Sequence, residues 1–217
     1  MLTLYHAPGE LSSRIVWLLE ELEADYTLVL THFPRPDGTV DPQNPHPHGY
    51  APALLHDGQL VTETGAVALY LTDLFPRSEV GVRVGHPLRG AYVSWMFYQV
   101  GMTEPLVNMQ AARLLEHCAP FDQLNTVMWA HLLHTLAAQP YLLGTRFTAV
   151  DILYTDLIRR VRPLLGPSAV LDDYQDSELT ISAIHDANGY RHIRQRLADQ
   201  YNLGSREPNI QVWAVDL

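Results

Sequence analysis

The sequence predicts an α/β domain followed by an all-helical domain, on three observations. First, residues 2–31 follow the order strand, helix, strand within a short span, which is typical of a parallel βαβ unit. Second, Asp57-Gly58 separates two short apolar runs and is a strong hairpin signal. Third, strand signals fade beyond about residue 80 and long helical patterns take over. The composition shift near that position marks the expected boundary between the two domains.

The βαβ unit is predicted from three short patterns. Residues 2–6 are apolar and precede a Pro-Gly turn signal, which is typical of a strand. Residues 12–23 place apolar side chains at helical spacing and leave three glutamates facing water. Residues 25–31 again have the character of a strand, so the three elements together predict β-α-β.

A proline-rich loop at residues 33–49 separates this unit from the predicted hairpin. Residues 53–56 and 59–62 form the two antiparallel strands of the hairpin. A helix follows over about residues 64–74, because apolar side chains fall on one face there. The first part of the chain therefore reads βαβ-ββα.

The second part of the chain is predicted to be helical. We expect the first domain at 1–78, a linker at 79–87 and the helical domain at 88–217. Its helical patterns cover roughly residues 88–117, 121–138, 148–163 and 180–199. Thr148 and Asp151 have the spacing of a capping box, which predicts a structural role at the start of a buried helix.

Composition excludes several classes of protein. The chain has 217 residues, 47% hydrophobic and 18% charged, which fits a folded protein with a sizeable core. Its formal charge of −10 makes binding to nucleic acid or to anionic lipid improbable. Cys118 is the only cysteine, so no intrachain disulfide can form. Without a membrane span or a leader pattern, we expect a cytoplasmic protein.

Four segments, in family order, resemble the bacterial cytosolic glutathione S-transferases. They are residues 12–22 (SSRIVWLLEEL), 51–54 (APAL), 62–71 (TETGAVALYL) and 144–152 (GTRFTAVDI). The resemblance covers nearly the whole chain. It implies an α/β thioredoxin-like N-terminal domain, an all-α C-terminal domain, glutathione as co-substrate, and a homodimer.

The resemblance also implies where glutathione binds. An X-Pro bond is cis in only ~5–6% of cases, so sequence alone favours an ordinary trans loop proline. The family places a cis proline at Pro52, which presents the Ala51 N–H and C=O groups to an extended peptide. Tyr50 stands where relatives often carry Lys, Arg or Gln for the glycyl carboxylate, and His48 is expected to share that role.

Glu63 and Thr64 lie between a strand and a helix. A helix start offers free N–H groups and a positive dipole end, which suit a carboxylate. Position alone favours a plain helix cap by Thr64 and a solvated Glu63. The resemblance instead assigns the γ-glutamyl carboxylate to Thr64 and the γ-glutamyl ammonium to Glu63.

Activation of the thiol is the open chemical question. Lowering its pKa of ~8.5 by about two units needs ~2.7 kcal/mol, more than the ~0.3–1 kcal/mol of a helix dipole. A hydroxyl donor, worth ~1.5–3 kcal/mol, completes the sum. Glu10 stands where relatives usually have serine, and a carboxylate there raises the thiol pKa. Ser12 is therefore the predicted catalytic residue, while Ser13, Tyr5, backbone amides alone, or a simple capping role remain open.

Tyr98 and Met102 are the predicted electrophile-pocket residues, although an aromatic or Met stripe equally fits a helix core. His46 and His48, like His131 and His134, lack the carboxylate or cysteine partners of a metal site, so none is expected.

The predicted function is a glutathione transferase acting on a small hydrophobic electrophile. The alternative is a glutathione-binding or scaffold protein of the same fold with little catalysis, which Glu10 favours. A dithiol redox protein is nearly excluded because there is no Cys-x-x-Cys motif.

Overall fold

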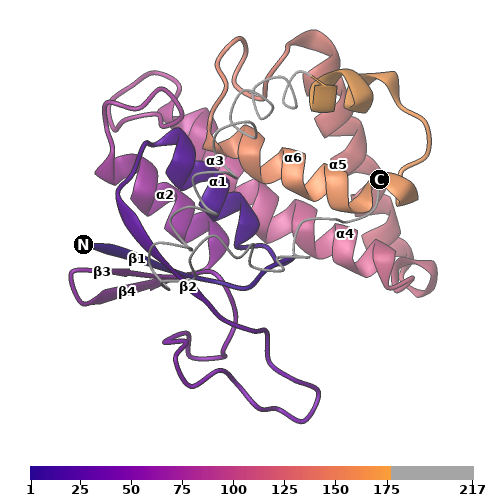
Figure 1. The fold of residues 1–217 in the computed structure, drawn as a ribbon. Helices are drawn as coiled ribbons and strands as arrows, with labels where there is room; N and C mark the ends of the chain where they lie inside the picture. The colour runs from indigo at the N-terminus through magenta and orange to yellow at the C-terminus, as the bar shows by residue number, and fades with distance from the viewer. Residues whose placement is uncertain (177–217) are drawn as a thin grey trace. The chain divides into compact units, whose positions relative to one another are not determined.

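The computed structural model describes residues 1–176 (Figure 1). Two compact units are present: Met1–Ala68, and the described part of Leu69–Leu179. The predicted helix over 180–199 lies outside the described residues. The domain ranges 1–78 and 88–217 stay predictions.

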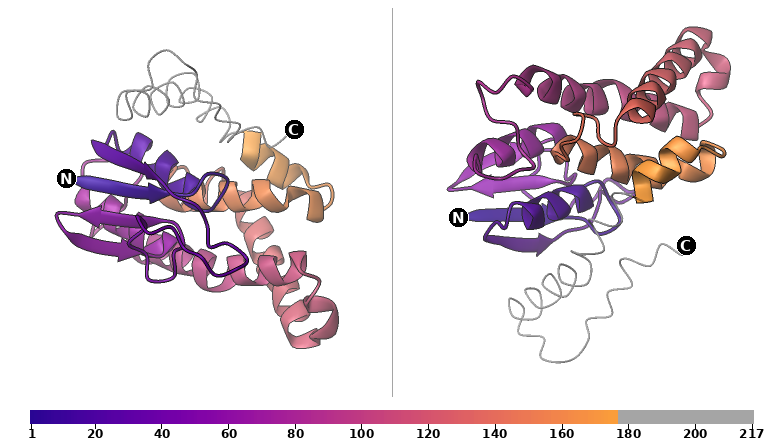
Figure 2. Two further views of the ribbon diagram at one scale, coloured as in Figure 1. Left: turned by 60° about the horizontal axis from the view of Figure 1, so that its bottom comes forward. Right: turned by 90° about the horizontal axis from the view of Figure 1, so that it is seen from above.

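The first unit contains a four-stranded sheet in the order β2-β1-β3-β4 (Figures 1 and 2). Its strands are β1 (Leu2–His6), β2 (Tyr26–Leu30), β3 (Ala53–His56) and β4 (Gln59–Thr62). β1 runs parallel to β2 and antiparallel to β3, and β4 is antiparallel to β3. Helix α1 (Ser13–Glu21) joins β1 to β2, and α2 (Thr64–Leu74) follows β4. The predicted βαβ-ββα order and its thioredoxin-like fold are confirmed.

Alternation along β1 decides which side chains enter the core. Leu2, Leu4 and His6 are buried, whereas the residues between them are half-buried, as the period of two in a strand requires. Helix α1 packs against β1 and buries Ile15 and Leu19 completely. Each such side chain contributes about 1.5–3 kcal/mol of burial. His6 is the polar exception on this apolar face.

The register of the sheet brings three turns to the same end of the strands. Tyr5 pairs with Ala53, so the end of β1 lies beside the start of β3. Ala53 also pairs with Thr62, so the end of β4 lies at the same end of the sheet. The turns that lead into α1, β3 and α2 therefore converge within the first unit.

The loop between β2 and β3 is held by internal contacts, although it extends away from the sheet in Figure 1. The Thr31 hydroxyl donates to Asp41 at 3.1 Å. Gly49 has φ +68, and a Cβ there would lie 2.6 Å from Val40 Cγ1, so only glycine fits. These contacts define the path into residues 50–52.

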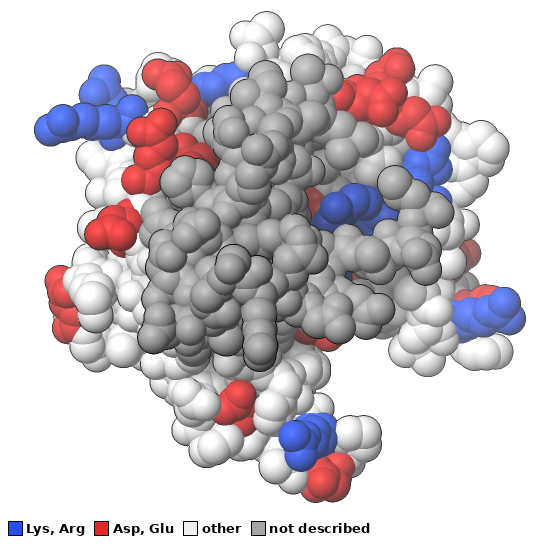
Figure 3. All heavy atoms as spheres, viewed as in Figure 1, with Lys and Arg blue, Asp and Glu red and all other residues white. Residues whose placement is uncertain are grey.

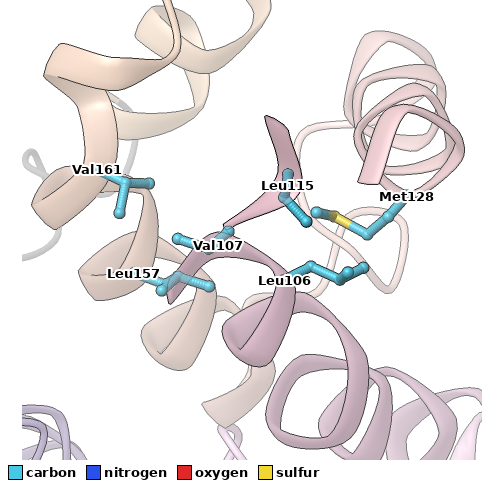
Figure 4. Close-up of a cluster of buried hydrophobic side chains, with 6 residues drawn as sticks. All are labelled: Leu106, Val107, Leu115, Met128, Leu157 and Val161. Atoms are coloured by element: carbon cyan, nitrogen blue, oxygen red, sulfur yellow. The ribbon is translucent and has the colours of Figure 1, made fainter. Parts of the chain in front are cut away.

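The second unit is helical. It contains α3 (Arg89–Tyr98), a π-helical turn (Gln99–Thr103), α4 (Glu104–Ala111), α5 (Ala119–Ala138) and α6 (Ala149–Val161), with 3-10 turns at Leu115–His117 and Arg162–Leu164. Figure 4 shows the buried cluster that joins α4, α5, α6 and the turn at Leu115–His117: Leu106, Val107, Leu115, Met128, Leu157 and Val161. Among the described helices, none has the length and apolar character to span a bilayer.

The helical pattern predicted over roughly 88–117 is confirmed as far as Ala111, but the helix is not regular. The π turn interrupts it, and α4 ends at Ala111. Pro105 has no N–H to donate to the carbonyl four residues earlier, at Gly101, and its ring crowds that carbonyl. A widened turn accommodates both defects. Arg113, at φ 56, then leaves the helical direction.

The predicted capping box at the start of α6 is confirmed. One carboxylate oxygen of Asp151 accepts from the Thr148 N–H at 2.9 Å and from the Thr148 hydroxyl at 3.1 Å. The other oxygen accepts from the Leu142 N–H at 2.9 Å and from the Tyr174 hydroxyl at 3.1 Å. Burial raises the pKa of Asp151 to about 6, while the hydrogen bonds that it accepts act in the opposite direction.

Candidate functional site

The turn between β1 and α1 is organised around the Ser12 hydroxyl, which is fully buried. The Ala7 N–H donates to Oγ at 3.1 Å, and Oγ lies 3.2 Å from the Ala7 carbonyl oxygen, to which it can donate. The Nδ1 atom of His6 lies 2.8 Å from the same oxygen. The hydroxyl is therefore engaged on all sides by the end of β1.

His6 is a buried histidine that remains neutral at pH 7. Its exposed fraction is 1%, and burial lowers its pKa from 6.5 to about 4. A neutral imidazole carries one N–H and one acceptor nitrogen, so its contact with Ser12 has a definite direction. Residue-based reasoning missed His6. The available signal was a polar residue on the buried face of an otherwise apolar strand.

The start of α1 leaves backbone donors uncapped. Ser13 Oγ donates back to the Glu10 carbonyl at 2.8 Å, and Ser12 makes no side-chain cap bond. The N–H groups of Leu11 and Ser12 have no hydrogen-bond partner among residues 1–176. Such donors at the positive end of a helix dipole suit an anion. Tyr5 instead lies within β1 and is half-buried.

The start of β3 offers a second pair of backbone groups. The Ala51–Pro52 peptide bond is cis, as the family resemblance implied. The Ala51 N–H and C=O groups make no hydrogen bond with any residue in the described part of the chain. They are placed where an extended peptide can add to the sheet.

The turn from β4 into α2 carries a strained residue. Glu63 has φ 70, in the left-handed region, which costs a non-glycine residue about 1–3 kcal/mol. Thr64 begins α2 and is 8% exposed, and its hydroxyl has no hydrogen-bond partner within residues 1–176. The cap position thus falls on Glu63, whose carbonyl accepts from the Val67 N–H at 2.9 Å. The carboxylate of Glu63 is 78% exposed.

Aromatic rings of the long loop lie beside this turn. Tyr50 stacks on Phe33 with centroids 4.8 Å apart. His46 accepts the His48 N–H at Nδ1 (3.1 Å), so its own proton resides on Nε2, 3.8 Å from the Glu63 carboxylate. Burial lowers the pKa of His46, and Glu63 opposes that change. Across residues 1–176 we find no cluster of three or more His, Cys, Asp or Glu side chains suited to a metal ion.

Tyr98 and Met102 lie in the second unit, half-buried against the cluster of Figure 4. Tyr98 also makes edge contacts with Trp95 and His131, and burial raises the pKa of Tyr98. Their surroundings are those of packing residues, and their role in an electrophile pocket stays a prediction.

Charge on the visible face is mixed (Figure 3). On the described surface that this view shows, arginine side chains are interspersed with Asp and Glu side chains.

Comparison with known proteins identifies the relatives of the chain. The family described as glutathione S-transferase, N-terminal domain, matches residues 1–73. Protein LigF of Sphingobium sp. is 44% identical in an alignment of 175 residues, with a coverage of 62% for this chain and 67% for LigF. The disulfide-bond oxidoreductase YfcG of Escherichia coli K12 is 28% identical in an alignment of 169 residues, with a coverage of 70% for this chain and 76% for YfcG.

Another match is confined to a segment. An uncharacterised Escherichia coli protein, YcgB, is 62% identical over 48 residues, which make up 22% of this chain. The chain covers only 9% of the length of YcgB, so this match carries no statement about the whole protein.

Solved structures agree on the fold. A glutathione transferase from Methylococcus capsulatus superposes with a TM-score of 0.70 at 22% identity, over 88% of this chain and all of that one (100%). A sphingomonad glutathione S-transferase complexed with glutathione gives a TM-score of 0.68 at 23% identity, over 86% and 98% of the two chains. The N-terminal match, the LigF relationship and this shared architecture together show that the chain belongs to the glutathione S-transferase family.

Proposed function

We propose that this protein is a glutathione transferase that activates the thiol of bound glutathione for attack on a small hydrophobic electrophile. One observation carries the proposal: three turns at one end of the sheet each present polar groups without a partner in the described chain. These groups are the Leu11 and Ser12 N–H donors, the Ala51 peptide groups and the Thr64 hydroxyl.

Glutathione is proposed to bind by its backbone and by its two ends. The Ala51 N–H and C=O groups pair with its peptide as a short strand addition. Thr64 receives the γ-glutamyl carboxylate with its hydroxyl and backbone N–H, at the positive end of α2. The exposed Glu63 carboxylate faces the γ-glutamyl ammonium, and Tyr50 donates to the glycyl carboxylate. The left-handed backbone of Glu63 supports a functional role for this turn.

Ser12 is proposed to stabilise the thiolate through its backbone N–H. Its hydroxyl is occupied by Ala7 and His6, so the N–H groups of Ser12 and Leu11 are the nearest available donors. A hydrogen bond to a charged group is worth about 1.5–3 kcal/mol and a helix start about 0.3–1 kcal/mol. Together these match the ~2.7 kcal/mol needed to lower the thiol pKa by two units. The thiolate sulfur then bonds to the electrophilic carbon, and the leaving group departs with the electron pair of the broken bond.

The alternative is a glutathione-binding or scaffold protein with little catalysis. Glu10 favours it, because a carboxylate near the sulfur raises the thiol pKa. The ultraviolet absorbance of bound thiolate, followed against pH, separates the two. A depressed thiol pKa supports the transferase, whereas binding without depression supports the scaffold.

A second catalytic use of the same thiolate is disulfide reduction, favoured by the relationship to YfcG. Cys118 precedes α5 in the second unit, so the electrons would come from glutathione. One thiolate attacks the disulfide to form a mixed disulfide and release one thiolate. A second glutathione thiolate then releases the other thiolate and leaves oxidised glutathione.

Calorimetry with millimolar glutathione tests the proposal as a whole. We expect heat release and a higher melting temperature for the wild type, and weaker binding for Thr64→Ala. Absence of both signals in the wild type would remove the proposed function. We further propose a cytoplasmic homodimer that serves detoxification, and sedimentation of the purified protein tests its assembly.

A further inference from the structure

The contact between His6 and Ser12 lies outside the roles assigned so far. His6 ends β1 and Ser12 precedes α1, and both side chains are inaccessible to solvent at 1% and 0% exposure. Their 2.8 Å contact therefore ties the end of the strand to the turn without any direct approach by a ligand. Neither side chain can attack a substrate from this position.

Counting hydrogens assigns the tautomer of His6. The Ser12 hydroxyl has one proton to donate and two lone pairs to accept with. It faces the Ala7 N–H, the Ala7 carbonyl and the His6 Nδ1 atom. If the hydroxyl donates to the carbonyl, it accepts from both the Ala7 N–H and an Nδ1–H. If it donates to Nδ1 instead, its contact with the carbonyl has no proton. Only the Nδ1–H tautomer satisfies all three contacts together.

The direction of this network matters for the turn. A Ser12 side chain held against Ala7 does not cap its own helix, and the N–H groups of Leu11 and Ser12 keep no partner in residues 1–176. The three contacts of the Ser12 hydroxyl tie the residue before α1 to the end of β1, so they fix the backbone of the turn that carries those amides. The histidine thus helps to hold the turn in the conformation that presents these donors to an anion.

We propose that His6 is a positioning residue whose neutral ring, protonated on Nδ1, holds the Ser12 hydroxyl against the Ala7 peptide and so fixes the turn that presents the Leu11 and Ser12 N–H groups to the glutathione thiolate. The proposal rests on the proposed function. It assigns to a residue that never touches glutathione an influence on the thiol pKa.

Substitutions that keep or remove the donor test this role. In His6→Asn the amide NH₂ replaces the Nδ1–H, whereas His6→Leu keeps bulk without a donor. We expect His6→Leu to raise the pKa of bound glutathione thiol by about one unit, which is about tenfold less thiolate at neutral pH. Glutathione affinity, measured at low pH where the thiol is protonated, should change less than about twofold, because the tripeptide's ends are held elsewhere. His6→Asn should restore the thiol pKa.

Substitution of Ser12, the partner of His6, and of a second histidine tests whether the effect is specific to this contact. In a Ser12→Ala background, His6→Asn and His6→Leu should give the same thiol pKa, because the group that they position is gone. His56→Leu alters another strand-terminal histidine, at the far end of β3, and should leave the thiol pKa unchanged. Equal thiol pKa values for wild type and His6→Leu, or no rescue by His6→Asn, would overturn the proposal.

Nitrogen NMR of the wild-type ring gives a readout that needs neither ligand nor variant. We expect a protonated Nδ1 and an unprotonated Nε2 for His6, and the opposite tautomer would refute the assignment even if His6→Leu fails to fold. If glutathione does not bind the wild type, the proposed function fails, while the Nδ1–H result still stands or falls by itself.

Discussion

Helices α1 and α6 both begin next to a hydroxyl residue with no solvent exposure, Ser12 and Thr148, yet the two hydroxyls act in opposite directions. Thr148 points into its own helix, where Asp151 completes a reciprocal capping box. Ser12 points back to the preceding strand and leaves α1 uncapped. One helix start is closed by its own side chains, and the other remains open.

The difference separates a structural helix start from a binding one. At α6 the N-terminal donors are used within the protein, and the gain is stability. Just before α1 the N–H groups of Leu11 and Ser12 have no partner in the described chain, a local cost that a bound anion can offset. Substitutions at α6 should therefore change the free energy of unfolding, whereas substitutions at α1 should change the chemistry of glutathione.

The largest change in the free energy of unfolding is expected at the N-terminus of α6. Asp151→Ala removes the acceptor for the Thr148 and Leu142 N–H groups and for the Tyr174 hydroxyl. Each buried donor left without a partner costs about 1–3 kcal/mol, so we expect a loss of about 3 kcal/mol or more. Urea unfolding measures it. Asp151→Asn, which keeps one oxygen, should lose less, and equal losses would contradict this account.

Low pH should lower the stability of the folded protein through His6, which lies at the turn before α1. Its pKa is lowered to about 4 in the folded protein, so the unfolded chain binds the proton more readily between about pH 6.5 and 4. The stability contribution is complete above pH 6.5 and is lost as pH falls toward 4, by about 3 kcal/mol at most. The unfolding free energy of wild type minus that of His6→Asn, followed against pH, isolates this loss. A flat difference would show that His6 is not buried in neutral form.

Ser12→Ala tests whether the turn before α1 contributes to the conjugation reaction. Loss of the hydroxyl frees the turn from Ala7 and His6, and we expect a conjugation rate at least about tenfold lower, equivalent to ~1.4 kcal/mol. Steady-state kinetics with an aromatic electrophile measures it. An unchanged rate would move the thiolate donor to Tyr5 or to backbone amides that do not depend on the hydroxyl.

The smallest effect is expected for Thr148→Ala, which keeps the backbone half of the capping box. We expect a loss of about 1 kcal/mol in the free energy of unfolding, seen as a lower urea midpoint. The thiol pKa of bound glutathione should not change. An unaltered midpoint would remove the functional contrast between the two helix starts.

Several features could be predicted from the sequence, because each depends on residues that are close together along the chain. The apolar alternation of residues 2–6, the Asp57-Gly58 turn and the Thr148–Asp151 spacing predicted elements that the structure contains. The cis bond before Pro52 came from family resemblance, since local chemistry favours trans. The helical pattern over 88–117 did not reveal the π turn before Pro105 or the end of the helix at Ala111, because periodicity does not report a widened turn.

The sequence by itself determined the order of strands and helices and the family of the protein, because hydrophobic periodicity and turn residues act over a few positions. Only the tertiary structure decided that Ser12 faces backward onto Ala7 and that His6 is its buried partner. Those contacts depend on where strand β1 ends relative to the turn and on the burial of both groups. A hydroxyl has one proton, and which neighbour receives it is settled by three-dimensional packing.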